Sequence, residues 1–119
     1  MRAVLTLVLV LVLAAFVALC SGCKKSEAAP LQGQELFVNA CSRCHGAGGG
    51  GGPPVFAGGP VPRNFRDSDF QLSRTDEQLK MTIKSGKGTG MPPFGNMFDD
   101  AQLEALVAHV RSFDPKRAR

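Results

Sequence analysis

Two cysteines and a histidine lie close together in the segment Cys41-Ser42-Arg43-Cys44-His45 of this 119-residue chain. If the segment is helical, positions i, i+3 and i+4 project from one side of a single turn. Both thiols could then bond to one edge of a porphyrin while the His45 imidazole binds the iron. The spacing is typical of a c-type haem attachment site, and it predicts one covalent haem c held by Cys41, Cys44 and His45.

Three other kinds of site use cysteines at this spacing: a structural disulfide, a redox dithiol and half of a zinc site. A thioredoxin-like dithiol needs a βαβ context, which the hydrophobic pattern does not show. A tetrahedral zinc site needs four nitrogen or sulfur ligands. Adjacent Cys44 and His45 could hardly both serve, and the only other histidine is His109. The residues therefore favour the haem site.

The N-terminus is typical of an export signal. Arg2 is followed by a run of apolar residues from 3 to 19, broken only by Thr6; this is short for a spanning helix but suits a signal peptide. Small residues precede Cys23 in Ser21-Gly22-Cys23, as in a bacterial lipobox, although Cys20 stands where that motif usually has leucine. We expect residues 1–22 to be a lipoprotein signal peptide and Cys23 to carry the lipid.

This assignment predicts an exported domain on the periplasmic side of a bacterial membrane. Residues 23–30 are short and polar and would form a tether, and residues 31–119 would form one domain. The alternatives are an uncleaved N-terminal anchor helix and secretion after cleavage elsewhere. Without Arg2, the chain has 13 basic and 10 acidic residues, a balance that does not indicate nucleic-acid binding.

Three helices are predicted, and no strand pattern is visible. The first covers residues 32–44, where apolar residues and cysteines recur at three- and four-residue steps. The second is about ten residues long and follows a capping box made by Thr75 and Gln78. It ends at Gly86, as helices often end at a glycine.

The third helix is predicted to begin after Asp99 or Asp100. Its apolar positions form a stripe at helical spacing: Leu103, Leu106, Val107, Val110 and Phe113. Two long segments rich in glycine and proline, residues 46–63 and 86–97, separate the helices and should be loops. Because a chain of this size without Trp or Tyr has a thin core, we expect folding and haem binding to be coupled.

Met91 is the predicted second axial ligand of the iron. Met1 lies in the leader, Met81 is expected mid-helix in a packing role, and Met97 lies beside Phe98 as a core residue would. Met91 lies in a loop that Pro92-Pro93 stiffens, which lowers the entropic cost of holding a weak thioether ligand. A rival ligand, His109, lies in the apolar stripe of the last helix, where we expect it to pack at an interface.

Residues 31–114 contain the haem motif, the Gly90-Met91-Pro92-Pro93-Phe94 loop and the last helix, in that order. In this order of features they resemble a small monohaem c-type cytochrome of the class I cytochrome c-like kind. Gly33 and Phe37 match a glycine and aromatic pair of that family, Leu106 matches a packing position, and Met91 matches the methionine ligand. His109 departs from the family, which usually has an aromatic residue there.

The resemblance implies an all-α fold of three main helices with long Gly/Pro-rich loops wrapped around one covalently bound haem. It also implies that a proline-loop carbonyl accepts a hydrogen bond from His45, and we expect this carbonyl at Pro53 or Pro54. Three polar residues could pair with the haem propionates or simply form a solvated loop: Arg63, Asn64 and Arg66.

Ligation by one histidine and one methionine leaves the iron no open position, which favours outer-sphere electron transfer. We therefore expect a one-electron carrier that cycles between Fe(III) and Fe(II), without enzymatic activity, in an exported, membrane-tethered respiratory or related electron-transfer chain. Its partners would be redox proteins that dock weakly, and it would be a monomer unless it is part of a complex. The alternatives are a haem subunit of a larger membrane oxidoreductase, a haem-based sensor and a peroxidase.

Overall fold

The computed structural model describes residues 28–117. The predicted signal peptide, the lipid site Cys23 and most of the predicted tether lie outside the described residues. Five helices are present in the described part: α2 (Ala28–Ala40), α3 (Ser42–His45), α4 (Ser68–Leu72), α5 (Asp76–Ser85) and α6 (Asp100–Ser112). Between residues 28 and 117 the only β-type pairing is an isolated bridge between Lys87 and Met91. The prediction of an all-α fold is confirmed.

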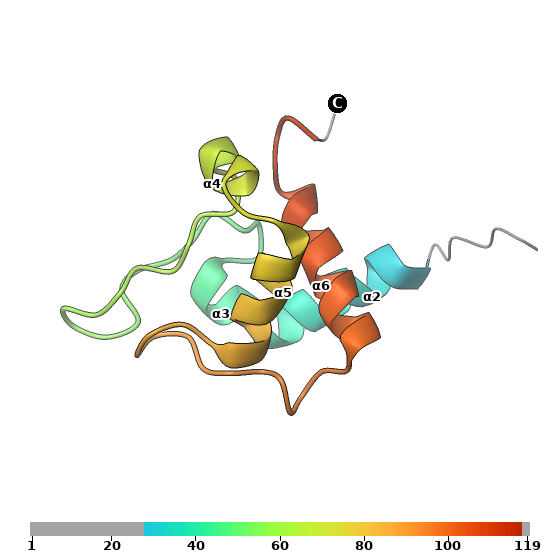
Figure 1. Cartoon of the computed structure of the whole chain (residues 1–119). Coiled ribbons are helices and arrows are strands. Elements are labelled where there is room, and N and C mark those ends of the chain that lie inside the picture. Colours follow the sequence, from blue (N-terminus) through green and yellow to red (C-terminus); the bar gives the residue numbers. More distant parts are fainter. Residues whose placement is uncertain (1–27, 118–119) are drawn as a thin grey trace, which may run out of the picture.

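Helix α6 packs against both α2 and α5, and long loops extend from the other side of this helical group (Figure 1). The crossing of α2 and α6 depends on Gly33. A Cβ atom at that position would lie 2.1 Å from the backbone oxygen of Ala105, far inside van der Waals contact. Glycine is therefore needed for the two backbones to approach this closely.

Both long C-terminal helices begin with a capping box; the one at Thr75 was predicted, whereas at Asp99 only a capping carboxylate was expected. In α5, the Thr75 hydroxyl accepts from the Gln78 N–H at 3.2 Å, and the Gln78 side chain accepts from the Thr75 N–H at 3.0 Å. In α6, Asp99 and Gln102 make the same reciprocal pair. These contacts satisfy N–H groups that have no partner within the helix.

Four of the five residues in the predicted apolar stripe of the last helix are buried, and the fifth, Phe113, is partly buried. Leu103 and Leu106 are completely inaccessible, as is Phe37 of α2. The other apolar members of this core are Phe65, Leu79, Ile83, Phe98, Val107 and Val110. Within residues 28–117, no helix is long and apolar enough to cross a membrane.

Four local predictions need correction. The first helix begins at Ala28 rather than at residue 32, and its helical assignment is interrupted at Cys41. The short helix α4 was not predicted; the Asp67 carboxylate caps it by accepting from the N–H groups of Asp69 and Phe70. Met97 is not a core residue, since its side chain is 65% exposed. Met81 is 60% exposed, so it does not have the packing role expected of it.

Candidate haem site

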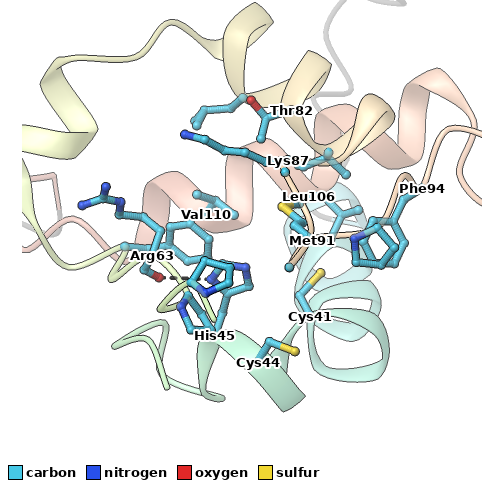
Figure 2. Close-up of a pocket in the computed structure, with 18 of the residues that line it drawn as sticks. Cys41, Cys44, His45, Arg63, Thr82, Lys87, Met91, Phe94, Leu106 and Val110 are labelled. Carbon is cyan, nitrogen blue, oxygen red and sulfur yellow. Dashed lines mark hydrogen bonds between the residues drawn. The ribbon is translucent and has the colours of Figure 1, made fainter. Parts of the chain in front are cut away.

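One cavity of about 840 Å³ brings together all four predicted haem-binding residues. Cys41, Cys44 and His45 reach it from the end of α2 and from α3, while Met91 reaches it from the loop between α5 and α6 (Figure 2). The remaining wall is mainly apolar and includes Phe37, Leu79, Ile83, Leu106 and Val110. The volume falls in the range of cofactor pockets, which typically run from about 300 to 1,000 Å³.

The two cysteines are placed by a single helical turn. The N–H groups of Cys44 and His45 both donate to the Cys41 carbonyl, at 3.1 and 2.9 Å. This turn puts both free thiols and the imidazole on the wall of the same cavity. Burial, followed by the neighbouring Cys44 thiol, raises the pKa of Cys41 from 9.0 to about 11. Since catalytic dithiols depend on a lowered pKa, the site does not have the character of a redox dithiol.

A backbone carbonyl fixes the orientation and tautomer of His45. The Nδ1 atom lies 3.1 Å from the Arg63 oxygen. Because a carbonyl can only accept, Nδ1 carries the proton and the Nε2 lone pair remains available to a metal. Burial lowers the pKa of His45 despite this hydrogen bond, which favours the neutral imidazole that metal binding requires.

The expected position of this carbonyl was wrong. We expected it at Pro53 or Pro54, but it belongs to Arg63, which directly follows Pro62. Pro62 was the signal that could have identified the correct turn. The same segment contributes Phe65, which the sequence analysis also missed; its ring stacks on the His45 imidazole with centroids 4.5 Å apart and planes at 21°.

The loop that carries Met91 is anchored to the C-terminal end of α5. The N–H groups of Phe94 and Gly95 donate to the carbonyls of Ile83 and Lys84 at 3.1 and 3.0 Å. These carbonyls belong to the last turn of α5, where helical partners are missing. The loop therefore folds back beside the helix and directs Met91 toward the cavity.

Two further contacts hold the backbone of Met91. Lys87 and Met91 exchange two hydrogen bonds, of 2.9 and 3.2 Å. Gly86 has a φ of +73°, and a Cβ atom there would lie 2.5 Å from the Met91 oxygen, so this turn needs glycine. Met91 is partly buried against the hydrophobic core. Met81 also lines the cavity but is largely exposed, and Met97 does not line it.

The residues predicted as possible propionate partners are divided between cavity and surface. Arg63 lines the cavity, with its guanidinium 5.1 Å from the centre of the Phe70 ring. Asn64 and Arg66 are exposed and do not line it; Arg66 instead donates to the Gly48 carbonyl. Arg74, which was not among the predicted residues, is a second arginine on the cavity wall.

The donor set and the cavity fit a c-type haem. Two thiols from one helical turn are available for thioether bonds, a neutral imidazole has a free Nε2 lone pair, and a thioether comes from a separate loop. The apolar walls suit a porphyrin face, and the guanidinium groups suit carboxylates. The cavity and its donor groups therefore fit the covalent haem c that the cysteine motif predicts.

His109 lies where the sequence analysis expected it, at the crossing of α2 and α6. Its ring packs against Phe37 and Phe113 with centroid distances of 5.1 and 4.8 Å, and it does not line the cavity. Burial lowers the pKa of its imidazole. It packs at a helix interface, as predicted, and is not placed to bind iron.

Comparison with known proteins gives a consistent result. The family described as cytochrome c oxidase, cbb3-type, subunit III matches residues 28–110. The chain is 32% identical over 89 residues to the cbb3-type cytochrome c oxidase subunit FixP of Sinorhizobium medicae; the alignment covers 67% of this chain and 28% of that protein. It is 26% identical over 80 residues to cytochrome c6 of Euglena viridis, with 67% of this chain and 87% of that protein covered.

Among solved structures, the KustC0563 c-type cytochrome is similar, with a TM-score of 0.58 and 30% identity. The match covers 69% of this chain and 96% of that one. By contrast, the chain spans only about a quarter of the length of the FixP relatives that it matches.

Proposed function

The chain belongs to the family described as cytochrome c oxidase, cbb3-type, subunit III, and we propose that it carries single electrons through a haem c attached at Cys41 and Cys44 and ligated by His45 and Met91. It is a small c-type cytochrome with one covalently bound haem c, and it is an electron carrier. The main support for assigning these four residues to the haem is that all of them line one mainly apolar cavity.

The bound haem supplies an Fe(III)/Fe(II) couple. His45 provides a neutral imidazole whose other nitrogen is committed to the Arg63 carbonyl, and this hydrogen bond makes the ring a stronger electron donor. Met91 provides a soft thioether, which favours ferrous over ferric iron. If His45 and Met91 both bind the iron, oxygen or peroxide would have no place to bind, and the role of the chain would be to hold the haem and to exclude water from it.

Partners would approach at the rim of the cavity. Val55, Val61 and Met81 line the cavity yet are 42%, 67% and 60% exposed. An exposed apolar rim with cationic residues beside it, such as Lys87, suits a small and transient contact of the kind that redox proteins make. The partners of this contact are proposed to be an electron donor and an acceptor protein.

The domain is proposed to be held at the periplasmic side of a bacterial membrane. Residues 1–22 would be the signal peptide, Cys23 the lipid site, residues 23–30 the tether and residues 31–119 the cytochrome domain. Replacing Cys23 with Ser should release the haem protein from membranes into the soluble periplasmic fraction. If the wild-type protein carries no acyl mass on Cys23, or still carries residues 1–22, the lipid proposal is wrong.

A second candidate is a fixed haem subunit of a larger membrane oxidase. The family description and the FixP relatives, which are oxidase subunits by name, favour it. Purification in mild detergent distinguishes the two candidates. A free carrier should be recovered as a monomer, whereas stoichiometric co-purification with oxidase subunits would favour the complex.

The ligand assignment is tested by replacing each methionine with alanine in the holoprotein. Met91→Ala should lower the midpoint potential and let carbon monoxide bind to the ferrous form at neutral pH. Met97→Ala is the matched control, because its exposed side chain does not line the cavity; it should behave as the wild type. If Met91→Ala leaves the spectrum and potential unchanged, or if Met81→Ala has the stronger effect, the assignment is wrong.

Carbon monoxide binding to the unaltered ferrous protein is a separate test. A haem-based sensor or a peroxidase needs an iron position that a small ligand can occupy. We expect no binding at neutral pH, and ready binding would favour one of these two alternatives.

A further inference from the structure

Two buried polar side chains outside the ligand set connect α6 with the segment that holds His45. We propose that Gln71 and Arg111 are positioning residues for His45: through the segment 63–65 they fix the orientation of its imidazole and the strength of its hydrogen bond. This inference rests on the proposed function, in which His45 is an iron ligand. It adds a role for residues that do not touch the cofactor.

The segment 63–65 makes both of the close contacts to the His45 ring. The Arg63 carbonyl accepts from Nδ1 at 3.1 Å, and the Phe65 ring stacks on the imidazole at 4.5 Å. The Phe65 side chain is buried, and its N–H donates to the Gly49 carbonyl at 2.7 Å. The position of this one segment therefore determines both the plane of the imidazole and the distance to its acceptor.

Gln71 fixes that segment from the side of α4. Its side chain is only 2% exposed, and its Nε2 donates to the carbonyls of Phe65 at 2.8 Å and Val110 at 2.9 Å. Its Oε1 accepts from Arg111 at 2.8 Å. Because arginine can only donate and carbonyls can only accept, the amide has one orientation, and all of its hydrogens are used.

Arg111 in turn fixes Gln71. The side chain is 6% exposed, and Nη1 donates to both the backbone oxygen and Oε1 of Gln71, at 2.6 and 2.8 Å. Its other nitrogens donate to the Arg74 carbonyl and, at 2.7 Å, to the Asp76 carboxylate. A buried cation is costly, and apolar side chains could often fill such a space with no loss of stability. Apolar side chains could not, however, fix the direction of the Phe65 carbonyl as the Gln71 amide does when Arg111 holds it.

The consequence for His45 has a predictable sign. If the segment 63–65 shifts, the Arg63–His45 hydrogen bond weakens and the imidazole becomes a poorer electron donor. A poorer donor stabilises ferric iron less, so the midpoint potential rises. The imidazole plane also rotates, because the Phe65 ring no longer holds it.

The test uses the holoprotein of Gln71→Met, which keeps the length of the side chain and removes its hydrogen bonds. Two properties are measured: the pattern of hyperfine-shifted haem methyl resonances in the ferric NMR spectrum, which reports the imidazole plane, and the midpoint potential. We expect a redistributed methyl pattern and an upward shift of the potential. Phe65→Leu, which removes the stacked ring but keeps the backbone carbonyl, should redistribute the same resonances.

Ser68→Ala is the matched control. It removes a 2.8 Å hydrogen bond between the first residue of α4 and Asp114, just after α6, so it loosens the same two elements without touching the segment 63–65. It should lower stability while leaving the methyl pattern and the potential unchanged. If Gln71→Met and Phe65→Leu give the wild-type pattern, or if Ser68→Ala changes it equally, the positioning role is refuted.

Failure of the inference can be distinguished from failure of the proposed function. If His45 and Met91 are not the ligands, the unaltered protein will lack the spectrum of a low-spin, histidine- and methionine-ligated haem. If only the positioning role is wrong, the unaltered protein will show that spectrum and the Gln71 variant will match it.

Discussion

The contact of Gly33 with α6 leads to a prediction in which two general effects have opposite signs. Replacing glycine with alanine inside a helix normally stabilises it by about 1 kcal/mol, because alanine loses less backbone entropy. In Gly33→Ala, however, the new Cβ would lie 2.1 Å from the Ala105 oxygen and 2.7 Å from its carbonyl carbon. Helix propensity thus predicts a more stable protein, and packing predicts a less stable one.

The structure indicates that packing wins. Ordinary contact begins at 3.4 Å, so α2 and α6 must separate locally by about 1.3 Å, the difference between that limit and the distance found. The obstructing atoms belong to the backbone and cannot move aside as a flexible side chain could. Overpacking typically costs about 1–3 kcal/mol. Because the clash is with backbone atoms, we expect a cost near the upper end of this range. After the gain in propensity is subtracted, we expect a net loss of about 1–2 kcal/mol.

Denaturant unfolding of the Gly33→Ala holoprotein measures this loss. Gln34→Ala is the control, because Gln34 is exposed on the same helix; it should change stability by less than about 0.5 kcal/mol. A Gly33→Ala protein as stable as the wild type, or more stable, would show that the helices do not cross this closely.

Three further changes follow from the same structure. Leu106→Ala should destabilise the holoprotein by about 2–5 kcal/mol in denaturant unfolding, because Leu106 is completely buried and lines the cavity; a smaller loss would contradict its place in the core. Thr75→Ala should cost about 1 kcal/mol through loss of the α5 capping box, and an unchanged midpoint would contradict the cap. Burial lowers the pKa of His109 below its ordinary 6.5, so the stability that depends on the neutral imidazole should be fully present above about pH 6.5 and should be lost as the pH falls below that value. His109→Phe should remove this part of the acid loss, and identical pH profiles of the two proteins would refute the argument.

The sequence was most informative where local chemistry decides the structure. The capping box at Thr75, the glycine at the end of α5 and the apolar stripe of α6 are local patterns, and all three were predicted. The spacing of the cysteines and the histidine, together with the proline-stiffened loop, identified four residues that do line one cavity. Two of them, Cys41 and Met91, are 50 residues apart in the sequence.

The errors concern features that tertiary contacts decide. Helix α4 has five residues, too few for a hydrophobic period, and it depends on the Asp67 cap and on the buried contacts of Gln71. The carbonyl that accepts from His45 could not be assigned because several prolines occur in the loop, and only the folded path shows that Arg63 reaches the ring. The misassignment of Met97 has the same cause: an apolar neighbour in sequence does not determine which way a loop side chain points.

The central claim is that the chain holds one haem covalently through Cys41 and Cys44. The most direct test is the intact mass of the exported protein after denaturation in acid, compared with that of a Cys41→Ala/Cys44→Ala variant. We predict that the wild type retains the mass of one haem and its colour, and that the variant loses both. A wild-type protein with the mass of the bare polypeptide, apart from any lipid, would contradict the account.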